Sequence, residues 1–393
     1  MPLNVWILVA AQALAMCTAP FIVFIGSIQG RMLAPSEGLA TLPVGMVVVG
    51  TVLAIKPATA LMARTGRKPV MLLGGLMGVA AGLTGATAAW LSSFPLLCLA
   101  ALLGGTGLAV VHQYRFAAME SVPPSLAGSA AARVLLGGLI AAWLGPEVAL
   151  AGRGAVGPAS FLDGWLALAA VQGLAMLVLG LGYRTRSELP RETAIRQGRP
   201  MGEILAQPLI WAAIGAAAIG YAVMSFIMTA TPLSMTEMAG HSLQDAKQVI
   251  QIHIVAMYLP SLISGWLTRT LGLPVMLVMG LLAYLACILL ALSGIDFHHY
   301  LSGLILLGIG WNFLFVAGTT LLPRGYNDEE RFRVQGLNDL MVFGSQATAA
   351  LTAGLALSAF GWSGVLLLVL PLLVLQAILV VAWQWRERRA MAG

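Results

Sequence analysis

The chain has 393 residues, of which 59% are hydrophobic and only 9% are charged. A soluble globular domain carries roughly 25% charged residues, so this composition excludes a water-soluble protein and indicates a chain surrounded by lipid. The net charge of +6 comes from basic residues that lie between apolar runs rather than in one stripe, which argues against a nucleic-acid-binding surface.

Apolar runs long enough to cross a bilayer follow one another along the whole sequence, since a helical span needs about 20 residues. The first run continues past residue 20 and has no basic segment before it, which favours a membrane span over a cleaved signal. The runs are continuous, whereas β-barrel strands would alternate. We therefore predict an all-α membrane protein of 12 transmembrane helices, at about 5–28, 41–62, 69–91, 94–117, 131–152, 159–182, 207–230, 247–270, 273–294, 298–321, 334–358 and 362–385.

One long polar segment, which contains five arginines, divides the predicted spans into six and six. We expect an N-terminal six-helix bundle at 1–182, a cytoplasmic linker at 183–206 and a C-terminal six-helix bundle at 207–393.

Two junctions between spans are similar, which indicates an internal repeat. The sequence TALMARTGRK at 59–68 is matched by GWLTRTLG at 265–272, and aligning Gly66 with Gly272 gives an offset of 206 residues. Parallel repeats of this kind are typical of secondary transporters. We expect two halves that rock about a central cavity to give alternating access.

The basic residues predict the orientation of the chain. If both termini lie in the cytoplasm, 17 of the 21 lysines and arginines lie on the cytoplasmic side, as the positive-inside rule requires. We expect a multi-pass protein of the bacterial inner membrane with both ends cytoplasmic.

The junction after the second span resembles a family signature. Arg64, Gly66, Arg67 and Lys68 match the G-x-x-x-D-R-x-G-R-K motif of the major facilitator superfamily, although Thr59 replaces the first glycine and Ala63 replaces the aspartate. The resemblance implies a fold of two six-helix halves and a conformational role for the four matching residues.

Two pairs of side chains in the seventh and eighth spans could bind a soft metal. Met224 and Met228 are four residues apart, as are His253 and Met257, and this spacing places both members of a pair on one helix face. Thioether and imidazole ligands suit cuprous copper. Methionine is also an ordinary filler of helical cores, so the pattern is open to both interpretations.

The paired motifs are similar to those of the CcoA-type copper importers, a branch of the same superfamily. This resemblance implies that Met224, Met228, His253 and Met257 form a path for copper, and that the ion supplies assembly of cbb3-type cytochrome c oxidase. Copper is then the transported substrate, and no resident cofactor is expected. We expect a monomer whose partners are the lipid bilayer and a cytoplasmic copper chaperone or copper-exporting ATPase.

Further residues are candidates for supporting roles. Glu147 and Asp339 are carboxylates within or near spans and could couple transport to protons. The candidates for an outer access site or for lining the cavity are Met235, Met238, His241, Gln251, Met16, Cys17 and His112.

The sequence contains no P-loop and no G-x-S-x-G, HExxH or CxxC motif, so we expect neither an enzyme nor an ATP-driven pump. Two alternatives to copper import stay open. One is the same fold carrying a small organic solute, such as a drug, a siderophore or a vitamin. The other is a membrane assembly factor that binds copper without transporting it.

Overall fold

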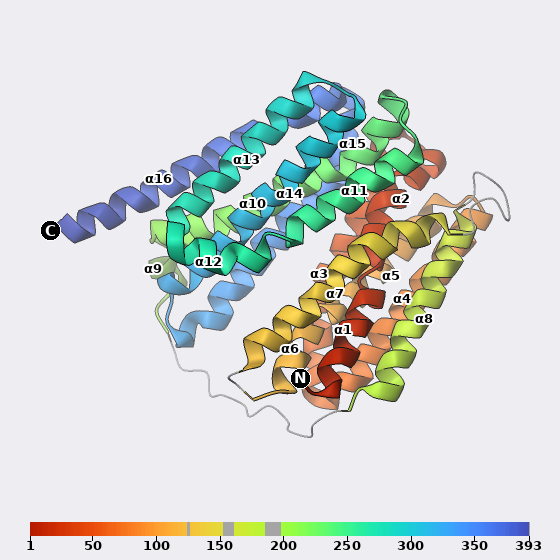
Figure 1. Ribbon diagram of the computed structural model, residues 1–393, viewed down its shortest axis with the longest axis horizontal. Helices are drawn as coiled ribbons and strands as arrows, with labels where there is room; N and C mark the ends of the chain where they lie inside the picture. The colour runs from red at the N-terminus through yellow and green to blue at the C-terminus, as the bar shows by residue number, and fades with distance from the viewer. Residues whose placement is uncertain (124–125, 152–160, 185–197, 393) are drawn as a thin grey trace. The chain divides into compact units, whose positions relative to one another are not determined.

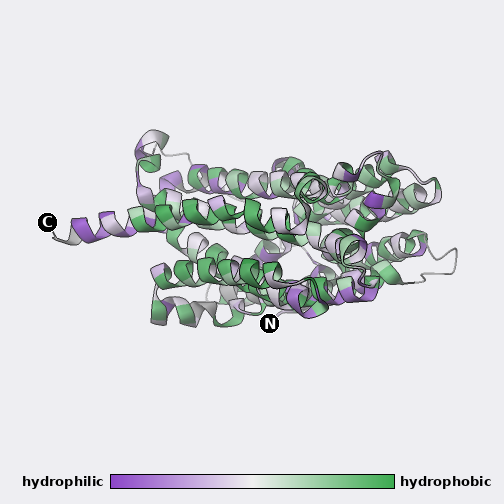
Figure 2. Ribbon diagram, turned by 90° about the horizontal axis from the view of Figure 1, so that it is seen from above, coloured by the Kyte–Doolittle hydropathy of each residue, from purple (hydrophilic) through white to green (hydrophobic). Residues whose placement is uncertain are grey.

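The computed structural model describes residues 1–123, 126–151, 161–184 and 198–392. Every regular element within these ranges is helical, as predicted. The chain divides into two compact units, Met1–Arg191 and Glu192–Gly393. Hydrophobic residues cover the long helices, and hydrophilic residues gather near helix ends, for example at the C-terminal end of the chain (Figure 2).

The first unit is a bundle of long helices with short connections (Figure 1). The predicted first span is broken into two helices at Met16 and Cys17. The elements are α1 (Leu3–Ala15), α2 (Thr18–Leu33), η1 (Glu37–Leu39), α3 (Leu42–Thr65), α4 (Arg67–Trp90), α5 (Phe94–Val111), α6 (Tyr114–Glu120), α7 (Ala127–Leu150) and α8 (Leu162–Gly182).

Buried polar side chains tie α8 to the first two helices. The amide of Gln172 donates to the carbonyl of Ala15 at 3.1 Å and to the hydroxyl of Thr18 at 2.8 Å, at the break between α1 and α2. The indole of Trp165 donates to Gln29 Oε1 at 2.8 Å. Because unpaired polar groups are costly in an apolar bundle, these contacts hold the broken span against α8.

The second unit has the same kind of organisation, with α10 packed against α14 and α15. The predicted eighth span is divided at Pro260 into two helices, because proline removes a backbone donor. The elements are α9 (Met201–Leu205), α10 (Pro208–Leu233), η3 (Ser234–Met238), α11 (Leu243–Tyr258), α12 (Ser261–Leu271), α13 (Leu273–Ser293), α14 (Phe297–Leu321), η4 (Leu322–Gly325), η5 (Asp328–Glu330), α15 (Arg331–Leu368) and α16 (Leu370–Ala392).

The helical stretches account for the predicted spans. Ten stretches of the described residues are long and apolar enough to cross a bilayer, and Leu136–Leu150 is a shorter one. The longest stretch, Arg333–Arg389, is interrupted at Gly361, where φ is 65° and ψ is −174°. It therefore supplies both the eleventh and the twelfth span, so that twelve spans fit the structure.

The two repeated junctions have the same backbone conformation. Gly66, between α3 and α4, has φ 86° and ψ 171°, and Gly272, between α12 and α13, has φ 81° and ψ 162°. Each glycine ends one helix and begins the next, with its N–H donating to Met62 O at 2.9 Å and to Thr268 O at 3.2 Å respectively. Glycine alone adopts these dihedral angles readily, which explains its presence at both junctions.

Arg199, which lies just before α9, is hydrogen-bonded to Glu330 in η5, just before α15. The Arg199 side chain donates to both carboxylate oxygens of the buried Glu330, at 2.8 and 2.7 Å, and the backbone N–H groups of Arg199 and Asn327 donate to the same carboxylate. These hydrogen bonds, above all those from the Arg199 side chain, lower the pKa of Glu330 to about 2. Part of the predicted linker is helical (α9), and its residues 185–197 lie outside the described ranges.

Candidate functional site

The four predicted metal ligands are all buried, on α10 and α11. The His253 ring is fixed to α14, because its Nδ1 lies 2.7 Å from the carbonyl oxygen of Leu304. A carbonyl can only accept, so Nδ1 carries the proton and Nε2 is left as an acceptor. Among the described residues Nε2 has no hydrogen-bond partner.

Helices α10 and α11 contact α14 far more extensively than they contact each other. The predicted meeting of Met224 and Met228 with His253 and Met257 therefore stays a prediction. No cluster of three or more His, Cys, Asp or Glu side chains occurs in the described ranges, so a metal bound there would depend on thioether ligands.

A group of aromatic rings from four helices lies in the same unit and was missed by sequence reasoning. Trp311 and Phe315 of α14 stack with centroids 5.2 Å apart and planes inclined by 8°. Tyr221 of α10 meets both rings edge-on, at 5.1 and 5.3 Å. Tyr258 of α11 lies 5.8 Å from Trp311, and Phe343 of α15 lies 6.3 Å from Tyr221. We call these five residues the aromatic cluster.

The aromatic cluster is only partly covered. Trp311 is buried, whereas Tyr221, Tyr258, Phe315 and Phe343 are half-buried. A buried tryptophan that supports partly exposed rings forms a surface on which a planar apolar group could stack. The signal that could have revealed it is the spacing of four between Trp311 and Phe315, but in an apolar span such a pair is easily read as core packing.

Several buried polar atoms on α10, α11 and α14 have no partner among the described residues. They are the acceptor nitrogen of His253, the hydroxyl of Thr229, the indole Nε1 of Trp311 and the amide oxygen of Asn312. The other end of the Asn312 amide donates to the carbonyl of Met257 at 2.7 Å. Because buried polar groups are almost always hydrogen-bonded in native proteins, these four atoms need a partner, and each is covered in the conformation that the structure describes.

The predicted conformational motif is built around an ion pair. Arg67, in the first turn of α4, binds the carboxylate of Glu120 at the end of α6 with both Nε, at 2.6 Å, and Nη2. Arg64 is exposed and Lys68 is half-buried. Sequence reasoning did not single out Glu120, because it lies in a short polar stretch between two spans.

The remaining candidates are scattered. In the first unit, Cys17 is buried and donates its thiol to Ala13 O at 3.1 Å, Met16 packs beside the core, His112 follows α5, and Glu147 is half-buried in α7.

In the second unit, Gln251 and Met235 are buried, whereas Met238 and Asp339 are exposed. His241 lies 2.7 Å from Ile295 O through Nε2, which places it beside the loop between α13 and α14. It does not join the aromatic cluster.

Two compact helical units with many apolar spans and a repeated junction are the architecture of a multi-pass membrane protein. The Major Facilitator Superfamily model matches residues 217–393. The chain is 35% identical over 372 residues to the riboflavin transporter RfnT of Brucella anthropi, which covers 95% of this chain and 93% of that protein. The chain therefore belongs to the major facilitator superfamily.

Solved structures agree on the fold. The nucleoside transporter NupG superposes with a TM-score of 0.71 at 15% identity, covering 98% of each chain. A bacterial homologue of the human lysosomal transporter Spinster gives a TM-score of 0.70 at 15% identity, covering 99% of this chain and 98% of that one. The predicted superfamily fold is confirmed, while the relative in Brucella anthropi is named for riboflavin rather than for copper.

Proposed function

We propose that the chain transports riboflavin, or a solute closely related to it, across the membrane by alternating access. The observation that carries this proposal is the 35% identity, over nearly the whole length of both chains, to a riboflavin transporter. Of the interpretations of the sequence, the small organic solute is thus better supported than copper.

The aromatic cluster supports the same proposal on physical grounds. The ring system of riboflavin is planar, with apolar faces and polar edges. Half-buried rings such as Tyr221 and Phe315 can stack on its faces, and the unpartnered polar atoms of Trp311, Asn312 and Thr229 can hydrogen-bond its edges or its hydroxyl groups. Riboflavin is uncharged, and no side chain of the aromatic cluster carries a charge.

Uptake of labelled riboflavin by proteoliposomes that contain the purified chain tests the proposal. We expect saturable uptake above that of empty liposomes, competed by unlabelled riboflavin. In cells, the test uses a riboflavin auxotroph that has no uptake system of its own. Expression of the chain should let this strain grow at a lower external riboflavin concentration. Uptake equal to that of empty liposomes, from protein that moves another solute, would contradict it.

Copper import through Met224, Met228, His253 and Met257 is a second candidate. The observation in its favour is the buried Nε2 of His253, which faces no partner within the described residues and is free to bind a metal. Its test is copper accumulation by cells that carry His253→Ala or Met224→Ala. Accumulation equal to wild type in both variants excludes this route.

We further propose that the chain lies in the bacterial inner membrane with both termini in the cytoplasm. The support is the concentration of arginines in alternate connections and after the last span. Reporters fused after residue 393 determine on which side of the membrane the C-terminus lies. Green fluorescent protein should fluoresce there, and alkaline phosphatase should be inactive. The opposite pair of results would reverse the orientation.

A further inference from the structure

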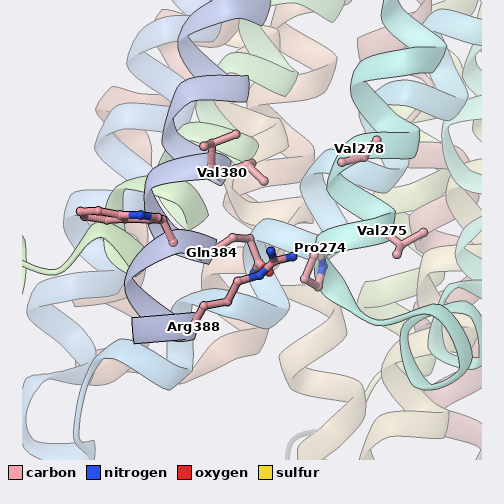
Figure 3. Close-up of a pocket in the computed structure, with 8 residues that line it drawn as sticks. Pro274, Val275, Val278, Val380, Gln384 and Arg388 are labelled. Carbon is pink, nitrogen blue, oxygen red and sulfur yellow. The ribbon is translucent and has the colours of Figure 1, made fainter. Parts of the chain in front are cut away.

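An open groove runs between α13 and α16 on the surface of the second unit (Figure 3). The residues that line it are distinct from those of the aromatic cluster. Its volume is about 510 Å³. Pro274, Val275 and Val278 form one wall, and the other wall comes from Val380 and its neighbours on α16, including Val381, Gln384, Trp385 and Arg388. Because these two helices touch at few positions, the groove stays open.

The groove is polar at one end only. Gln384 and Arg388 extend from α16 toward Pro274, whereas Val278 and Val380 lie at the other end (Figure 3). The amide nitrogen of Gln384 is buried and has no partner among the described residues. The polar end thus holds an unpaired amide donor beside a guanidinium, and the amide can turn toward a ligand by rotation about its side-chain bonds.

Arg388 differs from the arginines that flank it. Arg386 donates to the carbonyl of Ala206 at 3.2 Å, and the Arg389 guanidinium lies 3.6 Å above the ring of Trp385. Arg388 is exposed at the mouth of the groove. The first turn of α13 begins at the same end and contains no acidic residue, so the positive end of that helix dipole adds to the charge of Arg388.

The groove matches one leaflet of a bilayer in length. From Val380 to Arg388 an α-helix rises about 12 Å, and half of a hydrocarbon core is about 15 Å. A single acyl chain can therefore lie along the valines while its headgroup reaches Gln384 and Arg388. The arginines at this end mark the leaflet that faces the cytoplasm in the proposed orientation, and anionic lipids attract basic residues near that surface.

We propose that this groove is a binding site for an anionic phospholipid, with the phosphate at Arg388 and Gln384 and one acyl chain between α13 and α16. The site is separate from the solute path, and its occupancy does not depend on which solute is carried.

Native mass spectrometry of the full-length chain tests the site with lipids of matched acyl chains. The delipidated protein is titrated with phosphatidylglycerol and with phosphatidylethanolamine. We expect one phosphatidylglycerol per chain, bound at least about five-fold more tightly than phosphatidylethanolamine, as one basic residue at the surface provides. Equal binding of the two lipids, or chains paired into dimers that displace lipid, would overturn the proposal.

Three variants locate the effect. Arg388→Gln should abolish the preference for phosphatidylglycerol, and Val381→Trp should remove the bound lipid by filling the groove. Arg324→Gln is the matched control, because Arg324 is also exposed in this unit and its loss changes the net charge equally. A preference lost to the same extent in the Arg324 variant refutes a specific site, and circular dichroism of each variant verifies that it is folded.

Discussion

The matched junction glycines allow a sharp test of the internal repeat. Gly66 and Gly272 share a region of dihedral space that only glycine populates, and any other residue there costs about 1–3 kcal/mol. A Cβ at Gly66 would meet no atom within 4 Å, and one at Gly272 would meet only Pro274 Cδ, at 3.7 Å. The cost of an alanine is therefore conformational at both positions, with no steric clash to confuse it.

We expect Gly66→Ala and Gly272→Ala to destabilise the protein by similar amounts. For a domain the size of one unit, each kcal/mol lowers the midpoint by about 2–4 °C, so the expected drop is about 2–12 °C. The assay is thermal unfolding of the purified protein in detergent, followed by the fluorescence of a thiol-reactive dye or of tryptophan.

Gly336→Ala is the matched control. Gly336 lies within α15 and is exposed, and its Cβ would also meet nothing within 4 Å. Because alanine is favoured over glycine in a helix by about 1 kcal/mol, this variant should be as stable as wild type or more so. If all three variants behave alike, or if only one junction variant is destabilised, the argument from shared backbone conformation is wrong.

Three further predictions concern charge, recognition and coupling. Glu330→Gln should lower the unfolding midpoint at pH 7 and lower it much less at pH 3. The Arg199 side chain depresses the pKa of Glu330 from its ordinary value of 4.5 to about 2, so the ion pair stabilises the fold fully above pH 4.5 and this stabilisation is lost as the pH falls toward 2. An equal effect at both pH values would refute this. Phe315→Leu should weaken riboflavin binding about 5–150-fold, because stacking on an aromatic side chain contributes about 1–3 kcal/mol. Phe360→Leu, which replaces an exposed ring of α15, should leave binding unchanged. Quenching of flavin fluorescence measures binding in both variants. Glu147→Gln should abolish the stimulation of solute uptake by an imposed pH gradient while preserving counterflow exchange, and unaltered stimulation would remove Glu147 from proton coupling.

The spans were predictable because the membrane imposes a length and a composition on each one. The breaks within them were less so. Pro260 and Gly361 are visible in the sequence, but whether such a residue bends, breaks or merely tolerates a helix depends on the groups that pair with the freed backbone. Close to Pro260, the carbonyl of Met257 accepts a hydrogen bond from the Asn312 side chain, 55 residues further along the chain than Met257, and no local pattern could indicate this contact.

The aromatic cluster was not predicted from the sequence, because recognition depends on distances between helices, and the metal site on α10 and α11 stays a prediction. The spacing of Met224 and Met228 is a local pattern and is easily found. The convergence of Tyr221, Trp311 and Phe343 arises from the packing of α10 against α14 and α15, and no sequence period encodes it. An aromatic residue in an apolar span has the same appearance whether it faces lipid, core or solute.

The two junctions also bear on how such a chain originates. Beyond the shared glycine, the first corner continues with Arg67 and Lys68 and the second with Leu273 and Pro274, so their side chains have little in common. Their dihedral angles nevertheless agree within about 10°. If the two halves arose by duplication, substitutions have replaced most of the side chains around these junctions, while the glycine and its backbone conformation have been kept.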